Sequence, residues 1–119
     1  KHHTVQGGSN IIKLRGRSSF QSPAYNAVKM IEAAMGGEKF TLPAGCYVNC
    51  DKCGFKNVMM AMPSTIDKTG VHFVEPAGTE EEMASLAKSY EHLCKMRDEI
   101  VELGIVPPVA EWKKMNPNL

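Results

Sequence analysis

The first third of the chain carries apolar residues at the three- and four-residue spacing of amphipathic helices. Residues 11–14 predict a short helix that follows a break at the Gly-rich stretch 7–10 and ends at Gly16. A second helix is predicted over residues 23–35, with Ser22 as its N-cap and proline at its first position. This helix has few polar residues, so we expect either another domain or subunit or the rest of the chain to cover it.

Three strand-like runs follow the predicted helices. They span residues 39–48, 55–62 and 71–75, and short stretches rich in turn-forming residues separate them at 49–54 and 67–70. Connections this short favour hairpins over crossovers. The pattern therefore predicts a three-stranded antiparallel meander.

The longest helix is predicted to begin at Thr79. Thr79 and Glu82 have the spacing of a capping box, and apolar residues then recur at three and four positions as far as Leu103, with Gly104 as the stop. The apolar stripe is expected to pack across the sheet, with the charged residues facing water.

The tail, residues 105–119, is expected to run over the surface with Val109 and Trp112 as anchors. Together the elements predict an α+β fold: helices plus a three-stranded antiparallel meander that the long C-terminal helix covers. A chain of 119 residues has the size of a single domain.

Composition excludes some classes of function. With 14 basic and 13 acidic residues the net charge is +1, which provides no long-range attraction for nucleic acid or an anionic membrane. Lys113 and Lys114 and the arginines near Gly16 are too sparse for a nucleic-acid face. Apolar runs are too short to span a bilayer, and the N-terminus lacks an apolar signal sequence, so a cytoplasmic protein is expected.

The loop after Gly16 combines positive charge with small hydrogen-bonding side chains. These residues are Arg15, Arg17, Ser18, Ser19 and Ser22. Guanidinium and hydroxyl groups together suit a carboxylate or a phosphate, and the second helix would point its positive end near the same loop. The alternative is that the arginines are solvated and the serines are ordinary turn residues.

Four cysteines allow two interpretations. Cys46, Cys50 and Cys53 have C-x3-C-x2-C spacing across the first hairpin turn, with His92 and Cys94 as distant further ligands for a structural zinc ion. The favoured interpretation is reduced cysteines, with Cys46 and Cys94 buried as small hydrophobic residues.

Motifs for a self-contained active site are missing from the sequence. His72 is expected to face solvent or to be a satisfied core residue, and neither His72 nor His92 has a carboxylate at a spacing typical of a catalytic dyad. Glycine-rich nucleotide motifs, metalloprotease motifs and nucleophile elbows are also missing. We therefore expect no catalytic residue, no cofactor-binding residue and no metal ligand in this chain.

Residues 11–19 closely resemble the glycine-broken helix that lies near the substrate in the C-terminal half of the lactate/malate dehydrogenase family. The continuation at 20–25, together with 91–94 and 107–113, resembles the bacterial malate dehydrogenase subgroup of that family. The order of helices, antiparallel strands and a long helix also fits. The resemblance covers nearly the whole chain from about Gly7.

This resemblance implies an NAD-dependent oxidoreductase of the tricarboxylic acid cycle, which converts malate and NAD to oxaloacetate and NADH. Residues 1–119 would be the C-terminal substrate domain. The N-terminal NAD-binding domain, the catalytic histidine and the substrate-binding arginines would lie outside this chain, so the chain alone is expected to be inactive. The implied partners are that N-terminal domain, a small 2-hydroxy or 2-keto dicarboxylic acid, and further copies in a homo-oligomer, with neither nucleic acid nor membrane.

Within the resemblance, Ser18 stands two positions after the glycine, where relatives hold a threonine or serine that contacts substrate. Arg17 is a second candidate for substrate binding, although it replaces a residue that is often aromatic or small. Malate or lactate specificity is left open. The alternative hypothesis is a non-enzymatic binding or assembly module, clipped by zinc through Cys46, Cys50 and Cys53.

Overall fold

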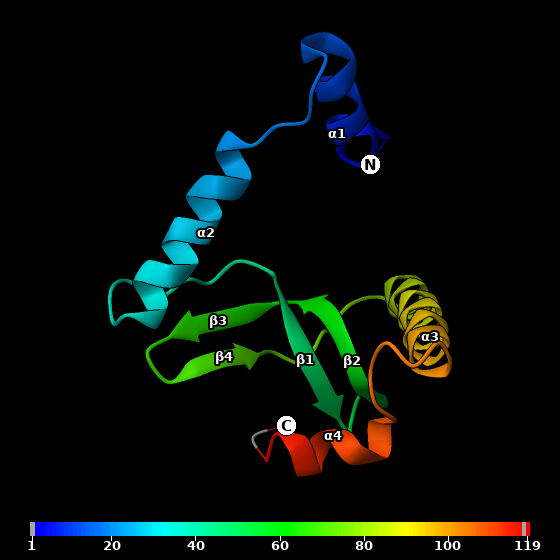
Figure 1. Cartoon of the computed structure of the whole chain (residues 1–119). Coiled ribbons are helices and arrows are strands. Elements are labelled where there is room, and N and C mark those ends of the chain that lie inside the picture. The colour runs from blue at the N-terminus through cyan, green and yellow to red at the C-terminus, as the bar shows by residue number, and fades with distance from the viewer. Residues whose placement is uncertain (1, 118) are drawn as a thin grey trace. The chain divides into compact units, whose positions relative to one another are not determined.

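The computed structural model describes residues 2–117 and 119, and side chains from Thr4 onward. Two compact units make up the chain: one contains the residues up to Phe40 together with Ile66–Gly70, and the other contains Thr41–Thr65 and Val71–Leu119. The elements along the chain are α1 (His2–Arg15), α2 (Gln21–Ala34), β1 (Ala44–Cys50), β2 (Phe55–Met62), β3 (Ser64–Asp67), β4 (Gly70–Phe73), α3 (Glu80–Glu102) and α4 (Val109–Met115) (Figure 1).

Helix α1 differs from its prediction. The break expected at residues 7–10 is wrong, because α1 runs through Gly7 and Gly8 without interruption. A glycine inside a helix costs only about 1 kcal/mol relative to alanine, so two of them weaken a helix without ending it. The end at Gly16 is confirmed: its N–H donates to the carbonyl of Ile12 over 2.8 Å.

Helix α2 occupies nearly the predicted residues but begins two positions earlier than expected. Phe20 is its N-cap and makes no side-chain capping hydrogen bond, so the prediction of Ser22 as N-cap is wrong. Pro23 is the third helical residue. This position tolerates proline because the first N–H groups of a helix have no intrahelical acceptor.

The strands are antiparallel, as predicted, but their number and pairing differ from a three-stranded meander. The described residues form two two-stranded sheets, β1 with β2 and β3 with β4. The run predicted to begin at residue 39 pairs with β2 from Ala44 onward, and before Pro43 only Phe40 pairs, in an isolated bridge to Ile66. Proline cannot donate to a ladder, so Pro43 precedes the start of β1 and Pro63 follows the end of β2. The strand β3 beyond Pro63 was not predicted.

The β1–β2 pair carries the main hydrophobic core. Alternate residues of β1 are buried, as are Val58, Met60 and Met62 of β2, which gives the pair one face toward the core. Partly buried residues of α3 pack against this face, and the rings of Phe55 and Tyr90 lie 4.7 Å apart. The prediction that the long helix covers the sheet is therefore confirmed for β1 and β2.

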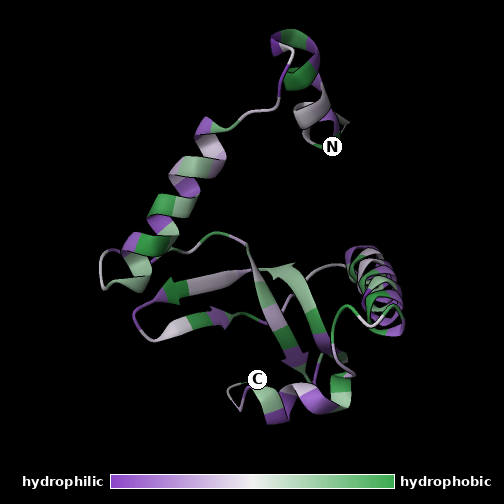
Figure 2. Cartoon of the chain, viewed as in Figure 1, coloured by the Kyte–Doolittle hydropathy of each residue, from purple (hydrophilic) through white to green (hydrophobic). Residues whose placement is uncertain are grey.

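Helix α3 begins as the sequence predicts. The Thr79 hydroxyl accepts the N–H of Glu82, and the Glu82 carboxylate accepts the N–H of Thr79, which completes the capping box. The hydrogen bonds that the Thr79 N–H and hydroxyl donate to the Glu82 carboxylate lower the pKa of Glu82 below its usual value. Figure 2 shows hydrophobic and hydrophilic residues interspersed along α3, as expected for a helix with one face on a sheet.

A β-bulge in the β1–β2 pair is held by α3. The register shifts between Val48 and Cys50, and Asn57 on the opposite strand has a φ of 54°. Tyr47 donates to the side-chain oxygen of Asn57 over 2.6 Å, and Arg97 donates to the backbone carbonyl of Asn57 over 3.0 Å. Asparagine tolerates this left-handed conformation better than most residues, so the bulge falls at a suitable position.

The tail contains a helix that the pattern did not predict. Pro108 precedes α4, whose Trp112 is partly buried, as is Val109. The Trp112 indole N–H donates to the carbonyl of Pro107 over 2.7 Å, and its ring lies 6.5 Å from that of Tyr47. Trp112 therefore anchors the tail as expected, whereas an anchoring role of Val109 stays a prediction.

Candidate functional site

Gly16 sets the course of the loop between α1 and α2. Its φ of 71° lies in the left-handed region, and no other group lies within 4 Å of the position that a Cβ would take. The constraint on this position is therefore backbone conformation and not space, because a residue with a Cβ would be strained there. This turn ends α1 and directs residues 17–20 toward the start of α2.

Two arginines on this loop are held by uncharged partners. Arg15 donates from Nη1 to the side-chain oxygen of Gln21 over 3.1 Å. The Arg17 guanidinium lies over the ring of Phe20, 5.0 Å from its centroid, in a cation–π contact. Neither contact neutralises the guanidinium charge. The loop therefore presents positive charge in positions that neighbouring side chains define.

Ser18 is exposed between these two contacts, while Ser19 is partly buried. The N–H groups at the start of α2 follow directly, and the first turn of a helix carries partial positive charge. The structure thus brings Arg15, Arg17 and Ser18 to one short loop. A hydroxyl, guanidinium groups and free N–H groups together suit an anion such as a carboxylate.

Helix α2, which follows the loop, has an exposed apolar side. Val28 is 62% exposed and Met35 is 83% exposed, and Tyr25 and Ile31 are also exposed. Their spacing of three and four residues places them along one stripe. Within its own unit, this helix therefore leaves much of its apolar surface uncovered.

A polar pocket of about 280 Å³ lies in the same unit, lined by Gly36, Gly37, Lys39, Asp67, Lys68 and Thr69. Hydrogen bonds from the hydroxyl and N–H of Thr69, together with Lys39, lower the pKa of Asp67 to about 2. Because this folded-state pKa is depressed, the interaction stabilises the turn above about pH 4 and is lost as the pH falls toward 2. The carboxylate therefore closes the β3–β4 turn.

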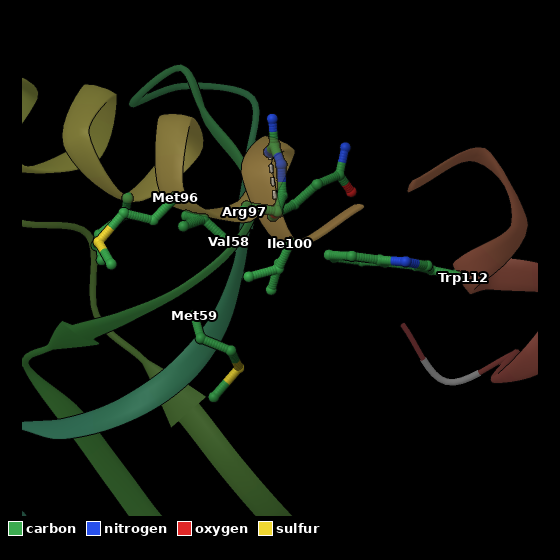
Figure 3. Close-up of a pocket in the computed structure, with 8 residues that line it drawn as sticks. Val58, Met59, Met96, Arg97, Ile100 and Trp112 are labelled. Atoms are coloured by element: carbon green, nitrogen blue, oxygen red, sulfur yellow. Dashed lines mark hydrogen bonds between the residues drawn. The ribbon is translucent and has the colours of Figure 1, made fainter. Parts of the chain in front are cut away.

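An apolar cavity of about 270 Å³ lies in the other unit (Figure 3). Its lining comes from β2, α3 and α4 and includes Val58, Met59, Met96, Arg97, Ile100 and Trp112. Arg97 is engaged already: it donates to the Asn57 carbonyl and, from Nε, to Asp98 over 2.8 Å. The cavity therefore suits an apolar group and not an anion.

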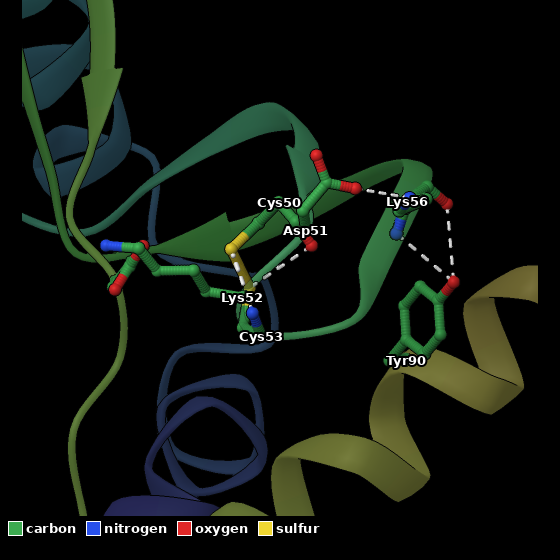
Figure 4. Close-up of a disulfide and its surroundings, with 7 residues drawn as sticks. Cys50, Asp51, Lys52, Cys53, Lys56 and Tyr90 are labelled. Atoms are coloured by element: carbon green, nitrogen blue, oxygen red, sulfur yellow. Dashed lines mark hydrogen bonds and ion pairs between the residues drawn. A yellow bond between two sulfur atoms is a disulfide. The ribbon is translucent and has the colours of Figure 1, made fainter.

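The cysteines differ from the favoured prediction. Cys50 and Cys53 are joined by a disulfide in the β1–β2 turn (Figure 4), so the expectation that all cysteines are reduced is wrong for this pair. Cys46 is buried as expected, whereas Cys94 is only partly buried. Burial raises the pKa of the Cys46 thiol, which donates to the carbonyl of Met60.

Metal ligation finds no support among the described residues, where no group of three or more His, Cys, Asp or Glu side chains is placed to hold a metal ion. His72 and His92 are both exposed, and His92 lies on α3. The zinc-clipped alternative thus lacks a ligand set in residues 4–117. Helices in the described part of the chain are also too short or too polar to cross a bilayer.

Sequence reasoning missed several groups around the loop and the cavity. Phe20 and Gln21 hold the two arginines, but neither residue type signals such a role by itself. The cavity requires Met59 and Trp112 to approach α3, and this depends on a helix in the tail that the pattern did not reveal. The C-x2-C spacing was the one signal available for the disulfide.

Comparison with protein families identifies a match over most of the chain. Residues 1–103 match the family model described as lactate/malate dehydrogenase, alpha/beta C-terminal domain. The match includes the Gly16 loop, α2, all four strands and α3.

Curated relatives show the same relation. A malate dehydrogenase from Sorangium cellulosum is 36% identical over 87 residues, which are 72% of this chain and 28% of the relative. A malate dehydrogenase from Geobacillus kaustophilus is 34% identical over 90 residues, covering 74% of this chain and again 28% of the relative. The chain thus spans little more than a quarter of the length of these relatives.

Solved structures with a similar fold are also described as malate dehydrogenases. A malate dehydrogenase from Plasmodium falciparum matches 86% of this chain and 33% of its own with a TM-score of 0.75 and 25% identity. One from Salinibacter ruber matches 85% of this chain and 33% of its own with a TM-score of 0.73 and 28% identity. The predicted fold class is confirmed by these matches.

Proposed function

Because this chain belongs to the lactate/malate dehydrogenase family and is its alpha/beta C-terminal domain, we propose that it forms the substrate domain of an NAD-dependent malate dehydrogenase. The complete enzyme would interconvert malate and oxaloacetate. The observation that carries the proposal is the segment at residues 15–20, which gathers a hydroxyl and two guanidinium groups beside a helix N-terminus. That loop would form one wall of the substrate pocket.

Ser18 is the residue to which we assign substrate contact. Its exposed hydroxyl would donate to a carboxylate of the dicarboxylic acid, a charge-assisted hydrogen bond that is stronger than one between neutral groups. Arg17, oriented by the ring of Phe20, would add positive charge near the same carboxylate. Arg15 would contribute less directly, since its hydrogen bond to Gln21 ties the two ends of the loop together.

The residues of this chain do not fit a nicotinamide dinucleotide. The sequence has no G-x-G-x-x-G fingerprint, and the strands of the described residues form antiparallel pairs, not the parallel sheet that such cofactors bind. We therefore assign NAD binding, and the histidine and arginines expected from the family resemblance, to a part of the protein outside this chain. No step of hydride transfer is assigned to residues of this chain.

Partners follow from the exposed apolar surface. The uncovered stripe on α2, with Val28 and Met35 among its residues, is suited to burial against the nucleotide-binding domain or a second copy of the protein. Assembly as a homo-oligomer, location in the cytoplasm and a place in the tricarboxylic acid cycle stay predictions. The zinc-clipped assembly module has no observation in its favour.

The experiment that tests this function is a rate measurement on the complete polypeptide that carries these residues. With NADH present, we expect oxaloacetate to cause saturable loss of absorbance at the nicotinamide wavelength, with a higher kcat/KM than pyruvate. Omission of either substrate is the control. A complete protein that turns over neither 2-oxo acid would exclude the proposed function.

A further inference from the structure

The turn between β1 and β2 holds two cysteines that the proposed function does not use. Cys50 is the last residue of β1, and Cys53 lies three residues later, with their Cα atoms 5.6 Å apart and their sulfurs joined (Figure 4). Both side chains contact the core cluster of the β1–β2 pair. The bond therefore lies at one end of the best-packed part of the chain.

This disulfide adds little to the stability of the hairpin. A cross-link between residues three apart removes far less freedom from the unfolded chain than one that closes a long loop. The strands are held independently by a ladder that runs from Ala44 and Met62 to Cys50 and Phe55. The hairpin can therefore persist when the sulfurs separate.

The two sulfurs have different surroundings. Cys50 is only 6% exposed, whereas Cys53 is partly exposed in the turn. The backbone N–H of Cys53 donates to the sulfur of Cys50 over 3.1 Å. A donor at this position stabilises negative charge on Cys50. An incoming thiolate thus has access to Cys53, and Cys50 is the better leaving group.

The charges around the turn are balanced. Lys56 pairs with Asp51, which lowers the pKa of that carboxyl, and Lys52 pairs with Glu75 over 3.4 Å. These pairs hold the turn on both sides of the cysteines. When the sulfurs separate, the structural change should therefore be confined to the turn. Because each acidic residue named here is paired with a lysine, its repulsion of a cysteine thiolate is reduced.

We propose that Cys50 and Cys53 form a reversible dithiol–disulfide exchange site whose reaction partners are small dithiols and their cyclic disulfides. In the reducing direction a thiolate of the dithiol attacks Cys53 Sγ, the Cys50–Cys53 bond breaks, and Cys50 leaves as a thiolate. The second thiolate of the reagent then attacks the reagent sulfur that is bonded to Cys53, and Cys53 leaves as a thiolate. The protein gains two electrons and two protons, and the dithiol becomes a cyclic disulfide.

Cys46 and Cys94 are not part of this disulfide. Cys46 is buried, and its thiol donates to the Met60 carbonyl. Cys94 is a free, partly buried thiol on α3. The site therefore comprises one pair, and two thiols stay outside it.

The test is a redox titration of the full 119-residue chain in mixtures of reduced and oxidised dithiothreitol, followed by an acid quench, alkylation in denaturant so that buried thiols react, and peptide mass spectrometry. We expect alkylation of Cys50 and Cys53 to rise together in one two-electron transition, from below about 10% to above about 90%, and to reverse on back-titration. Circular dichroism should show the same strand and helix content at both ends of the titration.

Two variants provide controls. Cys94→Ser should keep the whole transition, and Cys53→Ser should abolish it while Cys50 stays alkylatable at every ratio. The proposal is overturned if the wild-type pair stays reduced throughout, if it reduces only in denaturant, or if stoichiometric zinc is found on the two sulfurs. Pairing of Cys50 with Cys46 or Cys94 would overturn it equally.

Discussion

Replacement of Ser18 by alanine is expected to lower kcat/KM for oxaloacetate about 10- to 100-fold in the complete enzyme. The loss corresponds to a hydrogen bond to a charged group, roughly 1.5–3 kcal/mol, and each 1.4 kcal/mol is about a factor of ten. Ser18 is exposed on the loop after Gly16, so the change should not disturb folding. Steady-state kinetics with saturating NADH measures the effect.

Ser22→Ala is the matched control, since Ser22 is also exposed and lies four residues farther along, where it makes no N-cap. We expect its kcat/KM to stay within about twofold of the wild type. Ser18→Thr keeps the hydroxyl and should recover most of the activity. Equal rates for Ser18→Ala and the wild type would remove Ser18 from the substrate pocket.

Replacement of Met62 by alanine is expected to destabilise the β1–β2 unit by about 2–5 kcal/mol, because it removes a large side chain from a packed core. Met62 has 0% exposure and belongs to the cluster that α3 covers. Urea unfolding of the 119-residue chain, followed by the fluorescence of Trp112, measures the change in the free energy of unfolding.

Met59→Ala on the same strand provides the control. Met59 is 61% exposed, so its loss should change the free energy of unfolding by no more than about 0.5 kcal/mol. The two variants have the same change of side chain and differ in burial. If Met62→Ala and Met59→Ala lower the free energy of unfolding equally, the conclusion that β2 buries only one of its faces is wrong.

Local rules predicted the parts of the fold that depend on neighbouring residues. The capping box at Thr79 and the end of α1 at Gly16 each need only a few adjacent residues, and both are confirmed. The strand predicted over residues 55–62 coincides with β2, because strand-forming composition bounded by turn residues is also a local signal.

The predictions are wrong where the structure depends on contacts between residues far apart in the sequence, or on energetic effects that neighbouring residues can offset. Gly7 and Gly8 do not break α1, because glycine weakens a helix by an amount that neighbouring residues can offset. The strand β3, which follows Pro63, was not predicted, and it pairs with β4, so the strands pair two by two and not as a meander of three. The C-x2-C spacing of Cys50 and Cys53 is common to zinc sites, free thiols and disulfides, and only the three-dimensional position of the turn distinguishes them.

The candidate site was less accessible to reasoning from residue types. Arg15, Arg17 and Ser18 form a pattern that many surface turns share, and the substrate role proposed for Ser18 came from the family resemblance. The contacts that orient the arginines, with Gln21 and Phe20, emerged only from the structure. If the other groups of the site lie outside the chain, as we propose, the chain's own sequence cannot complete it.

We propose that this chain supplies one wall of a substrate pocket, while nucleotide binding and catalysis reside elsewhere in the protein. The most direct test is to assay the purified 119-residue chain for NADH oxidation with oxaloacetate, at the same molar concentration as the complete enzyme. We predict a rate for the chain alone that equals the protein-free background. Saturable, NADH-dependent turnover by the chain alone would contradict the account.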